Sequence, residues 1–287
     1  MKSNKKRQWI NNISWVGSLL GLCLAVMLIV SCNDDDDDPL PPAGGKLMIR
    51  FEHHVSGQPV TFNDMKYVNA AGNPFEVTDI QWFISDITLH KADGSSEVLE
   101  GDGTGDFVHY IDTGIPSTLT WEKEDTLQAG KYTGIAMTFG LKGPKNLRNY
   151  FTDPPESDME WPAPLGGDQG GYHYMKLNGF WLDPQQIREA FNFHLGVGPK
   201  KDNQGNTLFV QNWFETMLPN SSFEMESDET KEIVIVMNIE NWFHDPNLYD
   251  FNEVGAGIMN NQDAQQLAKE NGNNVFSIGS IKSHVQQ

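Results

Sequence analysis

The sequence predicts an all-β fold, an antiparallel β-sandwich of the immunoglobulin-like or a related type, with long loops and a few short helices. Three observations support this prediction. Short segments alternate apolar and polar residues, β-branched and aromatic residues are concentrated in those segments, and turn-forming residues separate them. Successive short strands joined by tight turns are typical of antiparallel sheets.

The expected strands lie between residues 47 and 239. The clearest alternation covers residues 47–53, and the longest β-rich run covers residues 75–90, which a turn at Asp93-Gly94 joins to residues 97–99. The other expected strands are residues 107–111, 131–139, 172–177, 190–195 and 232–239. The expected helices are residues 145–150, 184–190 and 263–271.

Residues 1–31 have the pattern of a bacterial lipoprotein signal peptide. Basic residues within the first seven positions precede an apolar run over residues 15–30, which is shorter than a typical membrane span. The run ends in IVSC at residues 29–32, which resembles a lipobox, where the cysteine is acylated and the chain is cut before it. We therefore expect Cys32 to be the lipidated first residue of the mature protein. The alternative is an uncleaved signal anchor.

Residues 32–45 are expected to form a solvated tether. An unbroken run of aspartates at 34–38 precedes a segment rich in proline and glycine. The acidic run resembles the export signal that sends Bacteroidetes lipoproteins to the outer face of the outer membrane. We expect an outer membrane lipoprotein at the cell surface, or otherwise on the periplasmic side, held to the membrane by its lipid. Residues 46–287 then form one β domain, which we expect to be a monomer.

Charge and cysteine content exclude several classes of function. The formal net charge is -19, and removal of the signal peptide makes the chain more acidic still. Such a field repels nucleic acid and anionic lipid, and it attracts cations and cationic proteins. The two cysteines are Cys23, which leaves with the signal peptide, and the lipidated Cys32. Disulfides, thiolate zinc sites, iron–sulfur clusters and thiol catalysis are therefore excluded.

Two histidines are expected to point inward from strands. Alternation places His53 on the apolar face of residues 47–53, and it places His173 and Met175 on the apolar face of residues 171–177. A buried imidazole needs a hydrogen bond or a metal to offset its desolvation. His194 lies on the face opposite its apolar neighbours and is expected at a sheet margin. Each histidine is also interpretable as a structural residue, because spacing alone does not bring them together.

Histidine and methionine without cysteine suit copper, particularly Cu(I), whereas oxygen-rich sites suit calcium. A long loop over residues 152–171, rich in proline and glycine around Trp161, lies directly before His173. Long ordered loops on β scaffolds often carry function. No phosphate-binding loop, nucleophile elbow or distinctive carboxylate pair is present, so we expect a protein that is not an enzyme.

Several segments together resemble the MbnP-like family of envelope copper-binding proteins, especially its lipoprotein members from Bacteroidetes. The resemblance extends from about Lys46 to Ile278. The segments that resemble the family are LMIRFEHH at 47–54, VTDIQWFISDI at 77–87, MEWP at 159–162, GGYHYMK at 170–176, FHLG at 193–196 and NWF at 241–243. Their order and spacing are more specific than any one of them.

The resemblance implies a β-sandwich-like domain that binds copper, as Cu(I) or Cu(II), outside the cytoplasm. In studied relatives a tryptophan is oxidised to kynurenine and supports copper binding alongside histidines, and this oxidation is attributed to a dihaem protein related to cytochrome c peroxidases. If this chain follows the family, the resemblance makes Trp161 the candidate for the modified tryptophan. His53, His173 and His194 are the candidate ligands, with Met175 as a further candidate. This chain lacks the cysteines of some family branches and a second tryptophan in the loop after Trp161, which weakens the case for the modification.

The leading hypothesis is a lipoprotein that scavenges, stores or delivers copper. Two alternatives belong to other classes. The first is a surface glycan- or ligand-binding lipoprotein, in which Trp161 and Trp181, expected in exposed loops, stack on sugar rings. The second is a structural or adhesion module whose aspartates bind calcium and stabilise the fold.

Overall fold

The structure is a computed structural model that describes residues 44–101, 107–166, 168–255 and 257–285. The chain divides into a unit of residues Met1–Pro39 and a unit of residues Leu40–Gln287, and every described residue belongs to the second. The predicted signal peptide, the lipidation site Cys32 and most of the predicted tether lie outside the described residues.

The described part of the chain consists mainly of strands, which confirms the predicted all-β class. The strands are β1 (Gly44–Val55), β2 (Gln58–Pro59), β3 (Tyr67–Val68), β4 (Pro74–Lys91), β5 (Ser96–Val98), β6 (Val108–Asp112), β7 (Thr120–Glu122), β8 (Leu127–Gln128), β9 (Gly130–Phe139), β10 (Met175–Leu182), β11 (Arg188–Leu195), β12 (Val197–Lys201), β13 (Thr207–Gln211), β14 (Phe214–Met217), β15 (Phe223–Met225), β16 (Glu229–Asn238) and β17 (Phe276–Val285). The α-helices are α1 (Phe251–Val254) and α2 (Gln262–Asn271). The 3₁₀ helices are η1 (Pro116–Leu119), η2 (Gly143–Asn146), η3 (Glu156–Met159), η4 (Ala163–Leu165), η5 (Ile239–Phe243) and η6 (Gly272–Asn274).

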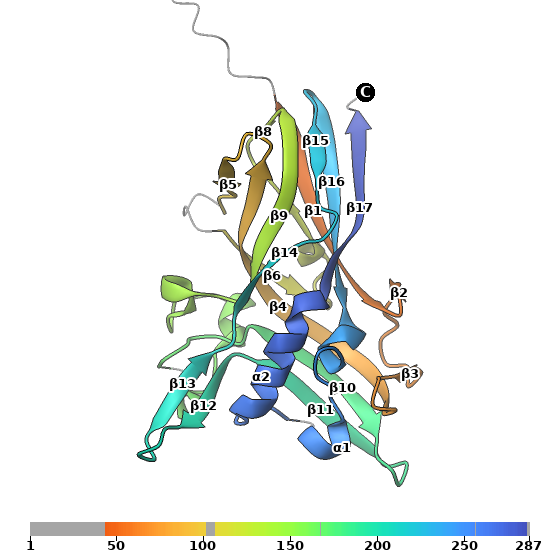
Figure 1. Cartoon of the computed structure of the whole chain (residues 1–287), viewed down its shortest axis with the longest axis vertical. Coiled ribbons are helices and arrows are strands. Elements are labelled where there is room, and N and C mark those ends of the chain that lie inside the picture. Colours follow the sequence, from red (N-terminus) through yellow and green to blue (C-terminus); the bar gives the residue numbers. More distant parts are fainter. Residues whose placement is uncertain (1–43, 102–106, 167, 256, 286–287) are drawn as a thin grey trace, which may run out of the picture. The chain divides into compact units, whose positions relative to one another are not determined.

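Two sheets pack against each other around one hydrophobic core. The first has the order β17-β16-β1-β2, with β7 and β8 also paired to β1, and Figure 1 shows β1, β16 and β17 side by side. The second has the order β11-β10-β4-β9-β14, with short strands paired to β4 and β9. Trp82 of β4 lies between the sheets, with its ring centroid 5.8 Å from that of Phe51 in β1 and 5.2 Å from that of Phe276 in β17. Strands β12 and β13 form a separate hairpin.

One pairing departs from the predicted antiparallel arrangement. Strand β1 pairs with β16 in parallel, with Ile49 opposite Ile233 and His53 opposite Met237, whereas the other named strand pairs are antiparallel. Alternation assigns the faces of a strand but does not depend on the direction of its neighbour. The sequence pattern therefore did not distinguish the two directions.

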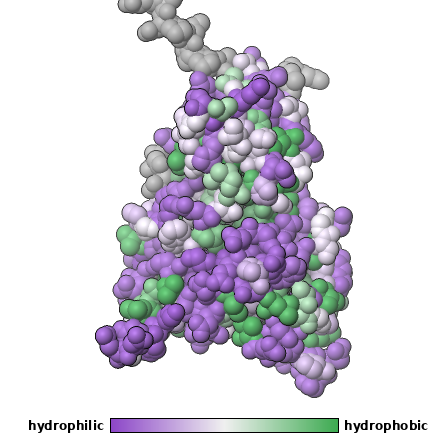
Figure 2. Space-filling view, in the orientation of Figure 1, coloured by the Kyte–Doolittle hydropathy of each residue, from purple (hydrophilic) through white to green (hydrophobic). Residues whose placement is uncertain are grey.

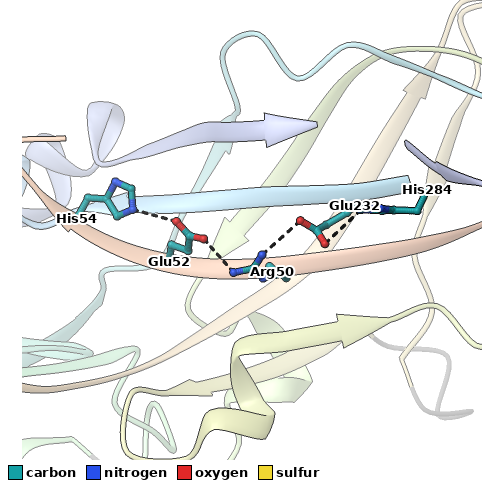
Figure 3. A network of polar contacts seen from close by, with 5 residues as sticks. All are labelled: Arg50, Glu52, His54, Glu232 and His284. Atoms are coloured by element: carbon teal, nitrogen blue, oxygen red, sulfur yellow. Dashed lines mark hydrogen bonds and ion pairs between the residues drawn. The ribbon is translucent and has the colours of Figure 1, made fainter. Parts of the chain in front are cut away.

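The outward face of β1 carries a row of charged side chains, as its alternation predicts. Glu52 accepts hydrogen bonds from Arg50 at 3.1 Å and lies 3.0 Å from Nε2 of His54. Arg50 also donates to Glu232 of β16 at 3.3 Å, and Glu232 lies 3.6 Å from Nε2 of His284 in β17 (Figure 3). Partly exposed ion pairs of this kind add little stability. They keep this face of the first sheet hydrophilic and leave the opposite face of β1 to the core.

Two of the three predicted helices differ from the structure. Helix α2 confirms the third, while η2 (Gly143–Asn146) lies partly before the expected segment 145–150. Residues 184–190 form a turn and the start of β11, because the carboxylate of Asp183 accepts hydrogen bonds from the backbone of Gln185 and Ile187, both at 2.8 Å. An aspartate that bonds the backbone ahead of it favours a turn over a helix. Strand β1 also begins at Gly44, within the predicted tether.

Helix α2 is bonded to the segments that follow β11 and β13. The side chain of Gln265 accepts hydrogen bonds from the backbone N–H of Gly196 at 3.1 Å and from Nδ2 of Asn212 at 3.0 Å. Gln265 is fully buried, so these bonds satisfy a polar group that would otherwise be costly to bury. Among the described residues no helix is long and apolar enough to cross a membrane. Figure 2 shows hydrophobic residues as small separate groups within a largely hydrophilic face.

Candidate metal centre

The described residues of the long loop predicted at 152–171 fold back onto the segment that precedes β10. Glu160 and Tyr172 form an antiparallel bridge, and the backbone N–H of Trp161 donates to the carbonyl of Gly171 at 2.8 Å. The backbone N–H of His173 donates to the carbonyl of Met159 at 2.7 Å. These bonds place Trp161 beside His173 although twelve positions separate them in the sequence.

Trp161 is held on three sides. Its indole N–H donates to the carbonyl of Leu165 at 2.9 Å, within the turn that the loop prolines form. Its ring centroid lies 4.6 Å from that of His173. The ring also covers Gly196, where a Cβ atom would lie 2.4 Å from the ring carbons Cε3 and Cζ3. The side chain is 1% exposed, so the predicted exposed-loop position of Trp161 is wrong.

His173, which is buried, and His194, which is half-buried, form a pair of imidazoles. Their ring centroids are 5.2 Å apart and the rings are nearly perpendicular. His194 lies in β11, on the same face as Lys176 of the neighbouring strand, and it is half-buried there as a sheet-margin position predicts. His173 lies in the irregular segment before β10, and its side chain is 5% exposed.

A hydrogen bond of the His173 ring shows which of its two nitrogens has a lone pair available to bind a metal. Nδ1 lies 2.9 Å from the carbonyl oxygen of Met159. A carbonyl oxygen only accepts, so Nδ1 carries the proton and Nε2 carries the lone pair. Metal-binding histidines commonly have one ring nitrogen fixed by a backbone carbonyl in this way.

The surroundings of His194 identify its free nitrogen as well. Nε2 lies 2.8 Å from Oδ1 of Asn178, whose own Nδ2 donates to Asp79 at 2.8 Å. The bond to Asp79 sets the orientation of the amide, so Nε2 of His194 must donate and Nδ1 must carry the lone pair. Nδ1 is buried and has no hydrogen-bond partner in the described structure. A buried acceptor without a partner is costly, and a bound cation would satisfy it.

Both imidazoles are neutral at physiological pH. Burial, with smaller contributions from His194 and Lys176, lowers the pKa of His173 to about 3, although the bond to Met159 opposes the shift. Burial lowers the pKa of His194 to about 4, with a further contribution from Lys176 and an opposing one from Asp79. Neutral imidazole is the form that binds a metal.

The structure does not bring His53 and Met175 together with this pair. His53 faces the core as predicted, but its Nε2 accepts a hydrogen bond from the indole N–H of Trp82 at 3.0 Å, which occupies the lone pair. Met175 is opposite Trp82 and Leu195 in the second sheet, so it lies in the core on the face away from His194. His173 does not share the face of Met175, because regular strand pairing begins only at Met175.

His53 makes the stability of the fold sensitive to acid. Burial lowers its pKa from 6.5 to about 3, with a smaller contribution from His54, so below pH 6.5 the unfolded chain takes up a proton that the folded chain does not. The free energy of unfolding should therefore fall with decreasing pH, by up to about 1.4 kcal/mol per pH unit from this residue. Chemical denaturation between pH 7 and pH 4 measures the slope. A His53→Gln variant, which accepts the bond from Trp82 without titrating, should show a shallower slope, and an equal slope would contradict the assignment.

Several residues of the site were not predicted from the sequence. Asn178 and Asp79 orient His194, and Gly196 makes room for Trp161. Of these contacts, only the one between His194 and Asn178 could be inferred from strand pairing. These two residues lie diagonally opposite each other on β11 and β10, and the register that places them there is not encoded in the sequence pattern. Trp181, the other tryptophan assigned to an exposed loop, is a buried residue of β10 opposite Phe75, so that assignment is wrong. Among the described residues no group of three or more histidine, cysteine, aspartate or glutamate side chains is arranged to hold a metal ion.

The fold and the histidine pair define an all-β protein with a candidate two-histidine metal centre. The profile of the MbnP family matches residues 44–261, and the chain belongs to this family. The match begins at the first residue of β1 and includes both histidines and Trp161. Among solved structures, MbnP from Methylosinus trichosporium is similar at 14% sequence identity and a TM-score of 0.45, with 84% of this chain and 99% of that chain covered. No curated protein matches the sequence.

Proposed function

We propose that this protein binds copper outside the cytoplasm, with His173 and His194 as the ligands and Trp161 beside them. The observation that carries the proposal is the buried Nδ1 of His194, which has no hydrogen-bond partner and belongs to a ring 5.2 Å from that of His173. Two nitrogens bound to one ion lie about 4 Å apart or less, since metal–nitrogen bonds are about 2 Å long. The centroid distance of the two rings is compatible with that requirement.

The donor set favours copper over other metals. Structural zinc sites need four ligands and calcium needs six or more oxygens, and the pair supplies two neutral nitrogens. Imidazole suits copper, and Cu(I) accepts a low coordination number. Calcium, the other candidate cofactor, has no comparable set of oxygen ligands in the described part of the chain.

Trp161 is the candidate for an additional role at the site. Its oxidation to kynurenine, as the resemblance implies, would open the five-membered ring and add a carbonyl oxygen and an amine beside His173. The indole is 1% exposed, so an oxidising partner cannot touch it directly. A dihaem partner of the cytochrome c peroxidase type would have to withdraw electrons through the protein that covers Trp161.

The proposed cellular role combines the site with the sequence pattern. The protein would be anchored by lipid at Cys32, on the outer face of the outer membrane or in the periplasm. There it would act as a monomer that scavenges, stores or delivers copper and catalyses no reaction. Its net charge, -19 for the full sequence and more negative without the signal peptide, would concentrate cations near the surface and favour a basic partner.

The test is metal analysis and intact-mass spectrometry of the protein isolated from its native membrane after growth with copper. One copper per chain and a lipid on Cys32 would support the proposal. An oxygen-dependent mass increase in the peptide that contains Trp161 would add the modification. Copper without that mass change would leave the binding role and remove the modification. Protein without copper would contradict the proposed function.

A further inference from the structure

A hollow lies at a bulge in the second sheet, on the strands β4, β9 and β14. It consists of two adjoining parts of about 390 and 300 Å³, which share Asp86 and Lys142. The first part also has Lys145 and Trp213 among its lining residues, and the second has Thr138 and Glu215. Volumes of this size are typical of small-molecule sites. We call this hollow the Asp86 groove.

Asp86 has a carboxylate oxygen that the protein leaves unsatisfied. The pairing of β4 with β9 is interrupted between Ser85 and Thr88, and Asp86 at this bulge has a φ of 50°. Its Oδ1 accepts a hydrogen bond from Lys145. Its Oδ2 is buried and accepts no hydrogen bond in the described structure, and Nζ of Lys142 lies 3.9 Å away. This oxygen needs a donor.

Thr138, which lines the same groove, carries a second unsatisfied group, its buried hydroxyl. Its side chain is 1% exposed, and its hydroxyl has no hydrogen-bond partner among the described residues. In the sheet it lies between Ser85 of β4 and Glu215 of β14. The hydroxyl of Ser85 is used, because it donates to the carbonyl of Gly140 at 2.7 Å. Two buried polar groups without partners in one hollow point to a polar occupant.

An aromatic ring and a balanced set of charges complete the groove. The ring of Trp213 is partly exposed, with Nζ of Lys142 at 5.6 Å and Nζ of Lys269 at 5.9 Å from its centroid. Lys142 forms an ion pair with Glu215, and Lys145 forms one with Asp86. The lysines disfavour a metal cation, and the carboxylates disfavour a simple anion.

We propose that the Asp86 groove binds a neutral hexopyranose unit of a carbohydrate. A hydroxyl group both donates and accepts, so adjacent hydroxyls of one sugar ring would donate to Oδ2 of Asp86 and pair with the hydroxyl of Thr138. The apolar face of the same ring would stack on Trp213. This site lies on β4, β9 and β14, whereas the histidine pair lies on β11 and before β10, so it is independent of the proposed copper function.

The experiment uses the purified full chain in a detergent without sugar head groups. Saturation-transfer NMR and calorimetry measure binding of methyl α-D-mannopyranoside, methyl β-D-glucopyranoside and methyl β-D-galactopyranoside at millimolar concentrations. At least one of them should bind. Thr138→Val, which keeps the shape of the side chain, should weaken that binding about tenfold, the effect of losing one hydrogen bond. Trp213→Ala should weaken it as well, whereas Thr133→Val, at an exposed position of the same strand, should not.

Thermal unfolding separates a sugar site from a buried water. If the hydroxyl of Thr138 is unpaired in the free protein, Thr138→Val should leave the melting temperature unchanged or raise it. A lower melting temperature would mean that the hydroxyl already holds a structural water, and it would overturn the proposal. Failure of all three glycosides to bind, or unchanged binding by Thr138→Val, would overturn it too. Copper content should be the same in every variant, so failure here is distinguishable from failure of the copper site.

Discussion

Replacing His173 or His194 with phenylalanine is expected to lower copper affinity by at least about a hundredfold. Phenylalanine keeps the ring packing beside Trp161 and removes the nitrogen that carries the lone pair. Loss of residues that only orient metal ligands already costs about 10–100-fold in affinity, so loss of a ligand should cost more. With two protein ligands in the described site, neither imidazole has a substitute.

Competition with a chromogenic Cu(I) chelator measures this effect, and two control variants define its specificity. His54→Phe changes a histidine on the outward face of β1 and should leave the affinity unchanged. His53→Phe should also bind copper normally, because the free protein already uses the Nε2 of His53 to accept the bond from Trp82. Unchanged affinity in both His173→Phe and His194→Phe would contradict the assigned ligands. A large loss of copper affinity in His53→Phe would show that His53 is a ligand, as the sequence analysis predicted.

The substitution Gly196→Ala is expected to disrupt the site without touching a ligand. The added methyl group would lie 2.4 Å from the ring of Trp161, and this ring is confined by His173 and by the bond from its N–H to Leu165. Overpacking of a filled core costs about 1–3 kcal/mol. We expect the free energy of unfolding to fall by that amount and copper binding to weaken, because Trp161 can move only toward His173 or out of the core.

Urea denaturation of Gly196→Ala beside Gly134→Ala checks this expectation. At Gly134 in β9 the nearest atom to a new methyl group is Sδ of Met217 at 3.1 Å, on an exposed side chain that can move. Gly134→Ala should therefore be neutral or slightly stabilising, since alanine restricts the unfolded chain more than glycine does. Combining Gly196→Ala with Trp161→Leu should cost less than the sum of the single changes. Additive losses would show that the clash with Trp161 is not the cause.

Local patterns predicted the faces of β1 well and the composition of the site only in part. The alternation in β1 correctly placed His53 inside and His54 outside. The same rule failed at His173, because alternation holds only where strand pairing is regular, and the backbone of His173 bonds to Met159 instead of a neighbouring strand. The position of His194 at a sheet margin was correct, but its contact with His173 depends on the register of β10 and β11.

Longer-range features were beyond the sequence pattern. Strand β17 was not expected, because the predicted strands end at residue 239, whereas His284 of β17 pairs with Thr230 of β16. The resemblance to the family brought Trp161, His173 and His194 onto one list of candidates, and the fold brings these three into contact. It also nominated His53 and Met175, which lie in the core around Trp82. Which candidates meet is decided by tertiary packing, which periodicity does not encode.

The parallel pairing of β1 with β16 sets an order for the folding of the domain. Lys46 in the first strand of the domain is opposite Thr230 in the last strand but one, so the ladder between these strands forms only after a loop through most of the domain has closed. One edge of β1 remains unpaired until that moment. An unpaired apolar edge strand invites association with other chains. The newly made protein is therefore prone to association for as long as β16 (Glu229–Asn238) has not been synthesised, and a chaperone that keeps β1 covered until then would lower that risk.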